Sequence, residues 1–162
     1  MKNGLEPIYD ENSKILILGS LPSEQSIKKQ EYYGNPTNQF WKILSAVFED
    51  KFLTFNDYEE KKNFLKKHHI ALWDVIKCAQ RKGSLDVNIK NETYNDLKTL
   101  VTKCEIKHIF VNGNKAKTAL EKYLKENNIP NVKFSYLTSS SSANAKYSLN
   151  EKINMWKIIS GL

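Results

Sequence analysis

Cysteine, arginine and long apolar runs are all scarce in this chain of 162 residues. The two cysteines, Cys78 and Cys104, are too few for a disulfide framework, an iron-sulfur cluster or a cysteine-rich zinc site. The longest apolar runs, residues 15–18 and 109–111, fall far short of the ~18 successive apolar residues that a membrane span requires. The N-terminus also lacks the apolar core of a secretion signal. We therefore expect a cytoplasmic protein with no membrane segment, no bound metal and no cofactor.

Lysine supplies almost all of the positive charge. Arg81 is the single arginine, and the 25 basic residues outnumber 18 acidic ones to give a formal net charge of +7. Such a balance favours polyanionic partners, nucleic acid foremost. Because guanine is usually read by two hydrogen bonds from arginine, we expect any DNA contacts to go mainly to phosphates. Lysine-rich surfaces also arise in AT-rich genomes, so the charge alone leaves nucleic acid binding open.

Four apolar runs predict the strands of one sheet. Residues 14–19 form a continuous apolar run that ends in glycine, which is typical of a strand buried on both faces of a parallel sheet. Similar runs cover residues 70–76, 106–112 and 132–137. The length and the hydrophobic content of 40% fit a single domain, residues 1–162.

Helical patterns alternate with these runs. Residues 40–48 place apolar side chains at i, i+3, i+4, i+7 and i+8, which predicts one buried helix face. The other expected helices cover 57–68, with Asp57 and Glu60 as a capping box, then 94–103, 115–126 and the segment after Ser148, whose box partner is Glu151. The alternation predicts an α/β fold, a three-layer α/β/α sandwich around a central, mainly parallel four-stranded sheet. Ligands in such folds bind beyond the C-terminal ends of the strands.

The loops after the first strand contain no phosphate-binding motif. Residues 19–26 match neither G-x-G-x-x-G nor G-x-x-x-x-G-K-[ST], which argues against a dinucleotide or nucleoside triphosphate site. Residues 32–41 instead gather two tyrosines and two asparagines around a glycine and a proline. Tyrosine rings can stack on a base, and an asparagine amide offers one acceptor and two donors to a base edge or a water. A purely structural interpretation, with tyrosines covering the core and asparagine capping the helix, remains open.

Four motifs in consistent order carry a family resemblance. They are GSLPSEQS (19–26) with YYGNPTNQFWKIL (32–44), LWDV (72–75) with RKGSLD (81–86), FVNGNKA (110–116), and LTSSSSANA (137–145). Together they resemble the uracil-DNA glycosylase superfamily, especially its hypoxanthine (deoxyinosine) DNA glycosylase branch, which is related to mismatch-specific uracil and thymine glycosylases. The resemblance runs from about residue 14 to the C-terminus.

The resemblance implies a monofunctional DNA glycosylase of base excision repair. Such an enzyme flips a deaminated base out of DNA, hypoxanthine foremost and uracil second, and hydrolyses its N-glycosidic bond. Its partner is DNA that contains deaminated bases, and we expect a monomer without a cofactor. A monofunctional enzyme is favoured because no lysine occupies the matched catalytic positions, where it could form a Schiff base.

The resemblance also implies roles for particular residues. Asn38, which precedes x-Phe-Trp, is the implied catalytic amide, and Asn35 is the alternative. Tyr33 would stack on the extruded base and Tyr32 would form a wall of the pocket or cover the core. The remaining base-binding residues are Gly19, Ser20 and Asn112, and the DNA-binding residues are Ser23, Ser139, Ser140, Ser141, Ser142 and Asn144.

Other polar residues receive a structural interpretation from their sequence positions. No carboxylate in the matched motifs is placed to deprotonate water apart from Glu24, and the spacing of Glu24 from the strand end favours a surface position. Asp74 follows Trp73 near a strand end, where orienting a loop is favoured over contact with the site.

Two alternative functions remain open. Ser20 and Thr138 stand where most relatives carry an amide or acid and a proline, which would fit a catalytically weak or inactive lesion-binding module with the same fold. An enzyme acting on free nucleosides is disfavoured because a small neutral substrate does not need a protein charge of +7.

Overall fold

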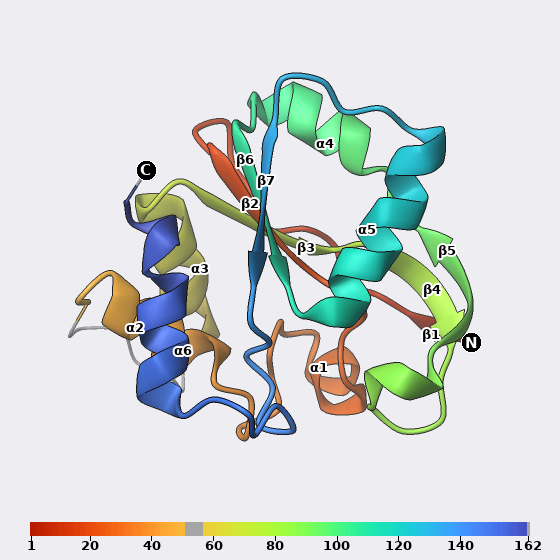
Figure 1. The fold of residues 1–162 in the computed structure, drawn as a ribbon, viewed down its shortest axis with the longest axis horizontal. Coiled ribbons are helices and arrows are strands. Elements are labelled where there is room, and N and C mark those ends of the chain that lie inside the picture. The colour runs from red at the N-terminus through yellow and green to blue at the C-terminus, as the bar shows by residue number, and fades with distance from the viewer. Residues whose placement is uncertain (51–56, 162) are drawn as a thin grey trace.

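A parallel sheet of four strands forms the centre of the fold (Figure 1). In the computed structural model, which describes residues 1–50 and 57–161, the strands are β2 (Ile15–Gly19), β3 (Ile70–Asp74), β6 (His108–Asn112) and β7 (Lys133–Leu137). Their order is β3-β2-β6-β7, and every neighbouring pair is parallel. The prediction of a parallel four-stranded sheet is confirmed.

The strand β2 is buried on both faces, as its uninterrupted apolar sequence predicts. Leu16 and Leu18 pack into the core that includes α4 and α5, whereas Ile15 and Ile17 pack into the core that includes α2, α3 and α6. Because successive side chains of a strand point to opposite faces, one apolar run contributes to both cores.

Helices cover both faces of this sheet, as Figure 1 shows. One side carries α2 (Phe40–Val47), α3 (Tyr58–Lys67) and α6 (Leu149–Trp156), and the other carries α4 (Leu97–Cys104) and α5 (Asn114–Glu126). A short helix, α1 (Glu24–Lys29), follows β2, and a 3-10 turn, η2 (Lys157–Ile159), follows α6. The three-layer α/β/α arrangement is confirmed.

Two of the helices begin at the predicted caps. The side chain of Asp57 accepts hydrogen bonds from the main-chain N–H groups of Glu59 and Glu60 at the start of α3. Ser148 and Glu151 form a complete capping box at the start of α6, with bonds of 3.2 and 3.1 Å. These short-range side chain to backbone bonds satisfy N–H groups that a helix start would otherwise leave unpaired.

A second, antiparallel sheet is an element that the sequence patterns did not predict. It contains β1 (Lys2–Asn3), β4 (Ile76–Gln80) and β5 (Lys90–Tyr94), and a 3-10 turn, η1 (Asp86–Asn88), lies between β4 and β5. The strand expected over 70–76 therefore ends at 74. The helix expected over 94–103 starts at Leu97, because Tyr94 belongs to β5 and Asp96 caps the helix.

The parallel strands all end at one edge of the sheet, the lower edge in Figure 1. Gly19, Asp74, Asn112 and Leu137 are the last residues of the four strands, so the loops that follow them meet there. No helix within the described residues is long and apolar enough to cross a membrane.

Candidate active site

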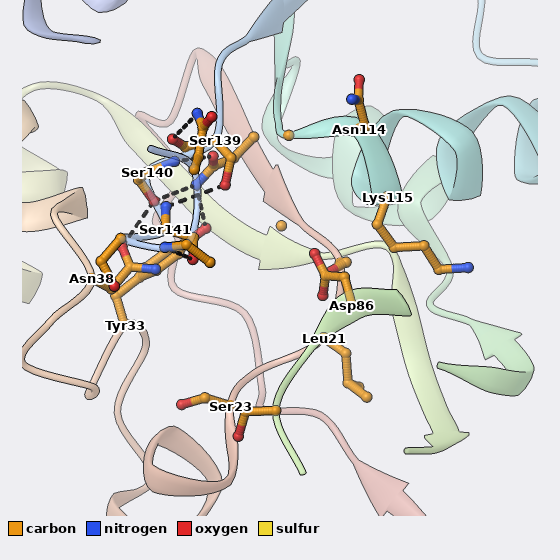
Figure 2. A pocket seen from close by; sticks show the side chains of 18 of the residues that line it. Leu21, Ser23, Tyr33, Asn38, Asp86, Asn114, Lys115, Ser139, Ser140 and Ser141 are labelled. Carbon is orange, nitrogen blue, oxygen red and sulfur yellow. Dashed lines mark hydrogen bonds between the residues drawn. The ribbon is translucent and has the colours of Figure 1, made fainter. Parts of the chain in front are cut away.

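A cleft of about 1050 Å³ opens at the C-terminal ends of the parallel strands. Its walls come from the loop after β2, the segment before α2, the η1 turn, the start of α5 and the serine-rich loop of residues 138–144, called the serine loop below. Figure 2 shows Tyr33 and Asn38 beside the serine loop, with Asp86 and Lys115 across the cleft. This position agrees with the expectation for a doubly covered parallel sheet.

Tyr33 is an aromatic platform in this cleft. Its ring stacks on Phe40 of α2, with centroids 3.8 Å apart and planes 11° apart. The backbone φ of Tyr33 is +53°, an uncommon conformation for a residue with a side chain. Its hydroxyl accepts a 3.0 Å hydrogen bond from Nδ2 of Asn112. Both contacts fix the orientation of the ring at the cleft.

A hydrogen-bond chain joins three polar residues from distant parts of the sequence. Nδ2 of Asn112 donates to Oγ of Ser140 at 2.9 Å, and Oδ1 of Asn112 accepts from the Ser140 N–H at 3.0 Å. Oγ of Ser140 in turn donates to Oδ1 of Asn38 at 2.9 Å. The chain therefore connects β6, the serine loop and the start of α2.

Asn38 has its carbonyl engaged and its amino group free. Oδ1 also accepts from the main-chain N–H of Phe40 at 3.0 Å, and a main-chain N–H can only donate, which fixes which atom of the amide is oxygen. Nδ2 has no hydrogen-bond partner among the described residues, and Asn38 lines the cleft. The two N–H donors are therefore available to a ligand.

Asn35 lies in the same cleft but is held differently. Its Oδ1 accepts from the N–H and the hydroxyl of Thr37, at 3.0 and 2.8 Å, which is a local turn closed within three residues. Unlike Asn38, it has no contact with the Asn112 and Ser140 chain.

Tyr32 occupies the core rather than presenting a free wall. Only 3% of its surface is exposed, and its hydroxyl donates to the main-chain oxygens of Leu5 and Glu6 at 3.1 and 2.8 Å. Its own carbonyl accepts from the indole of Trp41 at 3.1 Å. The ring borders the cleft, but its polar atom is directed into the fold, so the core-covering alternative describes its side chain better.

The serine loop is held rigidly from beneath. The carbonyl of Ser140 accepts from the Gln39 N–H at 2.9 Å, and the carbonyl of Thr138 accepts from the indole of Trp156 at 2.8 Å. Nζ of Lys152 donates to Ser141 O at 3.1 Å and to Oε1 of Gln39 at 2.8 Å. Lys152 is buried, which lowers its pKa, and it ties the loop to the start of α2.

The predicted DNA-binding serines divide into two groups. Ser140 is 1% exposed and its side chain is bonded to Asn38 and Asn112, so its hydroxyl supports the loop, and contact between Ser140 and DNA stays a prediction. Asn144 donates to Thr138 and Ser139 at 2.9 and 3.0 Å and therefore closes the loop.

The other members of that set are more accessible. Ser139 and Ser141 are half-buried and line the cleft, and Ser142 is exposed there. The Oγ of Ser23 accepts the Ser26 N–H at 3.1 Å as the cap of α1, so this side chain has a structural bond beside the cleft.

Two carboxyl groups lie in the cleft, contrary to the expectation that Glu24 alone would be available. Oδ1 of Asp86 accepts a 2.8 Å bond from the hydroxyl of Ser20. Asp74, at the end of β3, is 4% exposed, and its Oδ2 is buried without a hydrogen-bond partner. Burial and then the nearby charge of Asp86 raise the pKa of Asp74 to about 7. Glu24 itself is exposed and pairs with Lys2, which lowers its pKa.

The rim of the cleft combines lysines with exposed apolar and aromatic side chains. Lys117 lies over the ring of Tyr136 and Lys146 over the ring of Tyr147, with Nζ to centroid distances of 5.6 and 5.3 Å. In the η1 region, Val87 is 85% exposed and also borders the cleft. The single arginine, Arg81, is buried and donates to the carbonyls of the loop after β2, so it is not available on this rim.

Comparison with known proteins identifies the family. The sequence profile of the Uracil DNA glycosylase superfamily matches residues 6–160. The chain belongs to this superfamily. A hypoxanthine DNA glycosylase of Methanosarcina acetivorans is 41% identical over 98% of both chains, and one of Methanosarcina barkeri is 40% identical over 71% of this chain and 73% of that protein. A solution NMR structure from Methanosarcina acetivorans, described as a candidate uracil DNA glycosylase, has a TM-score of 0.79 at 37% identity over 98% of both chains.

Several residues of this uracil DNA glycosylase superfamily site carry no signal in the sequence. Lys152 follows the pattern of an exposed helix lysine, and Gln39 that of a surface residue before a helix. Asp74 and Asp86 lie in motifs with a family resemblance, but their sequence positions do not show that both enter one cleft. Among the described residues, no group of three or more His, Cys, Asp or Glu could hold a metal ion.

The burial of Asp74 predicts how the stability of this superfamily member depends on pH. Its pKa is raised from 3.8 to about 7, so between these values the folded chain retains a proton that the unfolded chain has lost. The free energy of unfolding should therefore fall as pH rises from 4 to 7, by on the order of 3 to 4 kcal/mol from this group. Urea titrations of the parent and Asp74→Asn from pH 5 to 8 measure this. As the pH rises, the variant should become progressively more stable relative to the parent. Parallel plots of unfolding free energy against pH would contradict the raised pKa of Asp74.

Proposed function

We propose that this protein is a single-domain, monomeric, monofunctional DNA glycosylase that extrudes a deaminated base and hydrolyses its N-glycosidic bond. Hypoxanthine is the foremost substrate and uracil the second. The observation that carries the substrate class is the similarity to two Methanosarcina hypoxanthine DNA glycosylases, one over nearly the whole chain. The cleft with its fixed tyrosine and free amide supports the same conclusion.

The proposed chemistry begins with base extrusion. Unpairing costs least for a deaminated, weakly paired base, which gives such bases an advantage over normal ones. The extruded base would stack on the ring of Tyr33. Phe40 stacks on this ring, with the two centroids 3.8 Å apart, and holds it in place. Gly19, where β2 ends, lets the Tyr33 hydroxyl pack against the strand end, because a Cβ atom there would lie 2.9 Å from that hydroxyl.

Asn38 is the proposed catalytic amide. Bond cleavage gives the sugar oxocarbenium character and places negative charge on the departing base. The free N–H groups of Asn38 can stabilise that charge or position the attacking water, and the Ser140 and Phe40 bonds hold them in place beforehand. Asn38 is favoured over Asn35 because its amide is fixed by Ser140 of the serine loop as well as by its own turn, whereas the amide of Asn35 is bonded only within its own turn.

The surroundings of the lysines support a monofunctional enzyme. Lys115 borders the cleft, but its ammonium lies 2.8 Å from the carboxylate of Glu92. Lys152 is buried beneath the serine loop with bonds to Gln39 and Ser141. Neither provides a free amine beside the proposed position of the sugar, and Lys117 and Lys146 lie on the rim over the rings of Tyr136 and Tyr147. Hydrolysis by water is therefore the expected reaction.

Base release from defined DNA tests the proposal. Duplexes carrying a single hypoxanthine, uracil, xanthine or thymine mismatch are incubated with the protein and then cleaved with alkali. We expect strand cleavage to be greatest for hypoxanthine and to require the alkali step, because a monofunctional enzyme leaves an intact abasic strand. Release from none of the duplexes would refute the enzyme assignment.

The rival function is a lesion-binding module without activity. Ser20 stands at the strand end where most relatives carry an amide or acid, and its hydroxyl is engaged with Asp86 at 2.8 Å. Tight, salt-sensitive binding to the hypoxanthine duplex with no base release would favour this alternative. A hydrolase of free nucleosides would instead show nearly no dependence on salt.

A further inference from the structure

Asp74 is a buried acid at the base of the active-site cleft whose chemistry the proposed function leaves unused. It is the last residue of β3, it lines the cleft, and it is 4% exposed. Its Oδ2 has no hydrogen-bond partner within the described residues. A buried carboxyl oxygen without a partner is costly, and sites of this kind are concentrated where a ligand completes the bonding.

Gly19 lets Asp74 and Tyr33 pack closely against the end of β2. A Cβ atom on Gly19 would lie 2.5 Å from Oδ1 of Asp74 and 2.9 Å from the hydroxyl of Tyr33. Any side chain there would clash with the carboxyl group and with the aromatic platform. The absence of a side chain therefore lets the acid and the ring meet at the strand end, where all three residues line the cleft.

The groups around Asp74 favour its neutral form. Asp86, on the η1 turn, is the charged neighbour that opposes ionisation, and Arg81, after β4, is the one that favours it. Tyr32 and Tyr33 face the same carboxyl, and burial raises the pKa of both, so they remain neutral. Burial has the largest effect, and the pKa of Asp74 is raised to about 7. A general acid works best when its pKa lies close to the working pH.

We propose that Asp74 is the general acid that protonates a ring nitrogen of the departing hypoxanthine. This inference rests on the proposed function. As the bond from C1′ to N9 breaks, its electron pair moves onto the base, and the proton of the Asp74 carboxyl group passes to the ring nitrogen, so that neutral hypoxanthine leaves. Water then adds its oxygen to C1′ and gives a proton to the Asp74 carboxylate, which restores the acid. One water is consumed, and free hypoxanthine and an abasic sugar are formed.

Asn38 and Asp74 divide the work in this scheme. An amide can donate a hydrogen bond but cannot transfer its proton at neutral pH, whereas a neutral carboxylic acid can do both. Asn38 projects from the start of α2 beside the serine loop, and Asp74 lies at the base of the cleft beside Gly19. The base would therefore be contacted by an amide and an acid from separate walls.

The test is the pH dependence of single-turnover base release from a hypoxanthine duplex. The parent rate should be level below about pH 6 and fall roughly tenfold per pH unit well above 7, because only the protonated acid is active. Asp74→Asn should lower the rate at pH 6 about 100-fold or more and should lose the fall at high pH. Thermal unfolding of the variant, which is isosteric and uncharged, establishes that it is folded.

Asp96→Asn is the matched control. It makes the same chemical change at the exposed cap of α4, outside the residues that line the cleft, and asparagine caps a helix as well as aspartate. This variant should retain the parent rate and the parent profile. A parent rate that rises through pH 7, or an Asp74→Asn variant with the parent rate or the parent profile, would overturn the proposal. Absence of release by the parent at every pH would instead refute the glycosylase function itself.

Discussion

Asn38→Ala should release hypoxanthine roughly 100-fold or more slowly than the parent, with little change in DNA affinity. The reason is that its two free N–H donors act on charge that develops only during bond cleavage. The substitution removes the bond to the Phe40 N–H and the acceptor for Ser140, which should lower the free energy of unfolding by about 1 to 2 kcal/mol. A loss of this size should leave the protein folded. Single-turnover rates and duplex binding, measured on the same preparation, separate the two effects.

Asn35→Ala provides the control within the same loop. It removes an amide that also borders the cleft but is bonded only to Thr37. We expect a loss below about tenfold, the equivalent of one lost positioning contact. The opposite pattern, a folded Asn38→Ala enzyme at the parent rate with Asn35→Ala inactive, would place the catalytic amide at Asn35.

Gly19→Ala should reduce kcat/KM for hypoxanthine release by about 100-fold or more. The added methyl group would lie 2.5 Å from Asp74 and 2.9 Å from the Tyr33 hydroxyl, so one of these must move. A displacement of about 1 Å in a positioned group can cost a factor of this size. The stability loss should be on the order of 1 to 3 kcal/mol, as for other overpacked sites. Steady-state base release and urea unfolding measure both.

Gly161→Ala serves as the control for adding a methyl group. Within the part of the chain that the structure describes, its Cβ would meet no atom closer than 3.8 Å, so both activity and stability should remain near the parent values. Parent-like activity in Gly19→Ala would show that the close packing of Tyr33 and Asp74 on Gly19 is not needed for base release.

The serine loop shows how one motif can serve structure and function together. Ser140 in this loop is buried and bonded, while Ser142 is exposed at the cleft. The buried residues hold the loop on Asn112, Gln39 and Lys152, and the exposed part remains available for DNA. Because the loop is already ordered, it can contact the duplex without a further loss of conformational entropy on binding.

The sequence by itself determined the central sheet and most of the helices that cover it. The apolar side chains of residues 14–19 are shielded from water on both faces only when the strand lies between two helix layers. The capping side chains of Asp57 and Ser148 bond to main-chain N–H groups within three residues of their own positions. These features depend on periodicity and on neighbouring residues, which a sequence displays directly. The second sheet escaped prediction because β4 and β5, with the sequences IKCAQ and KNETY, contain no continuous apolar run and pair with register shifts.

The tertiary structure alone decided which of the predicted site residues lie together in the cleft. Tyr32 and Tyr33 are neighbours in sequence, yet the hydroxyl of Tyr32 is bonded to Leu5 and that of Tyr33 to Asn112, and only Tyr33 has a positive φ. Ser140 meets Asn38 across 102 residues of sequence, a contact that no local pattern specifies. The ionisation of Asp74 likewise depends on burial and on Asp86, which approach it only when the strands and loops pack. Local propensities fix elements, whereas the chemistry of this cleft depends on long-range packing and on the low dielectric that packing creates.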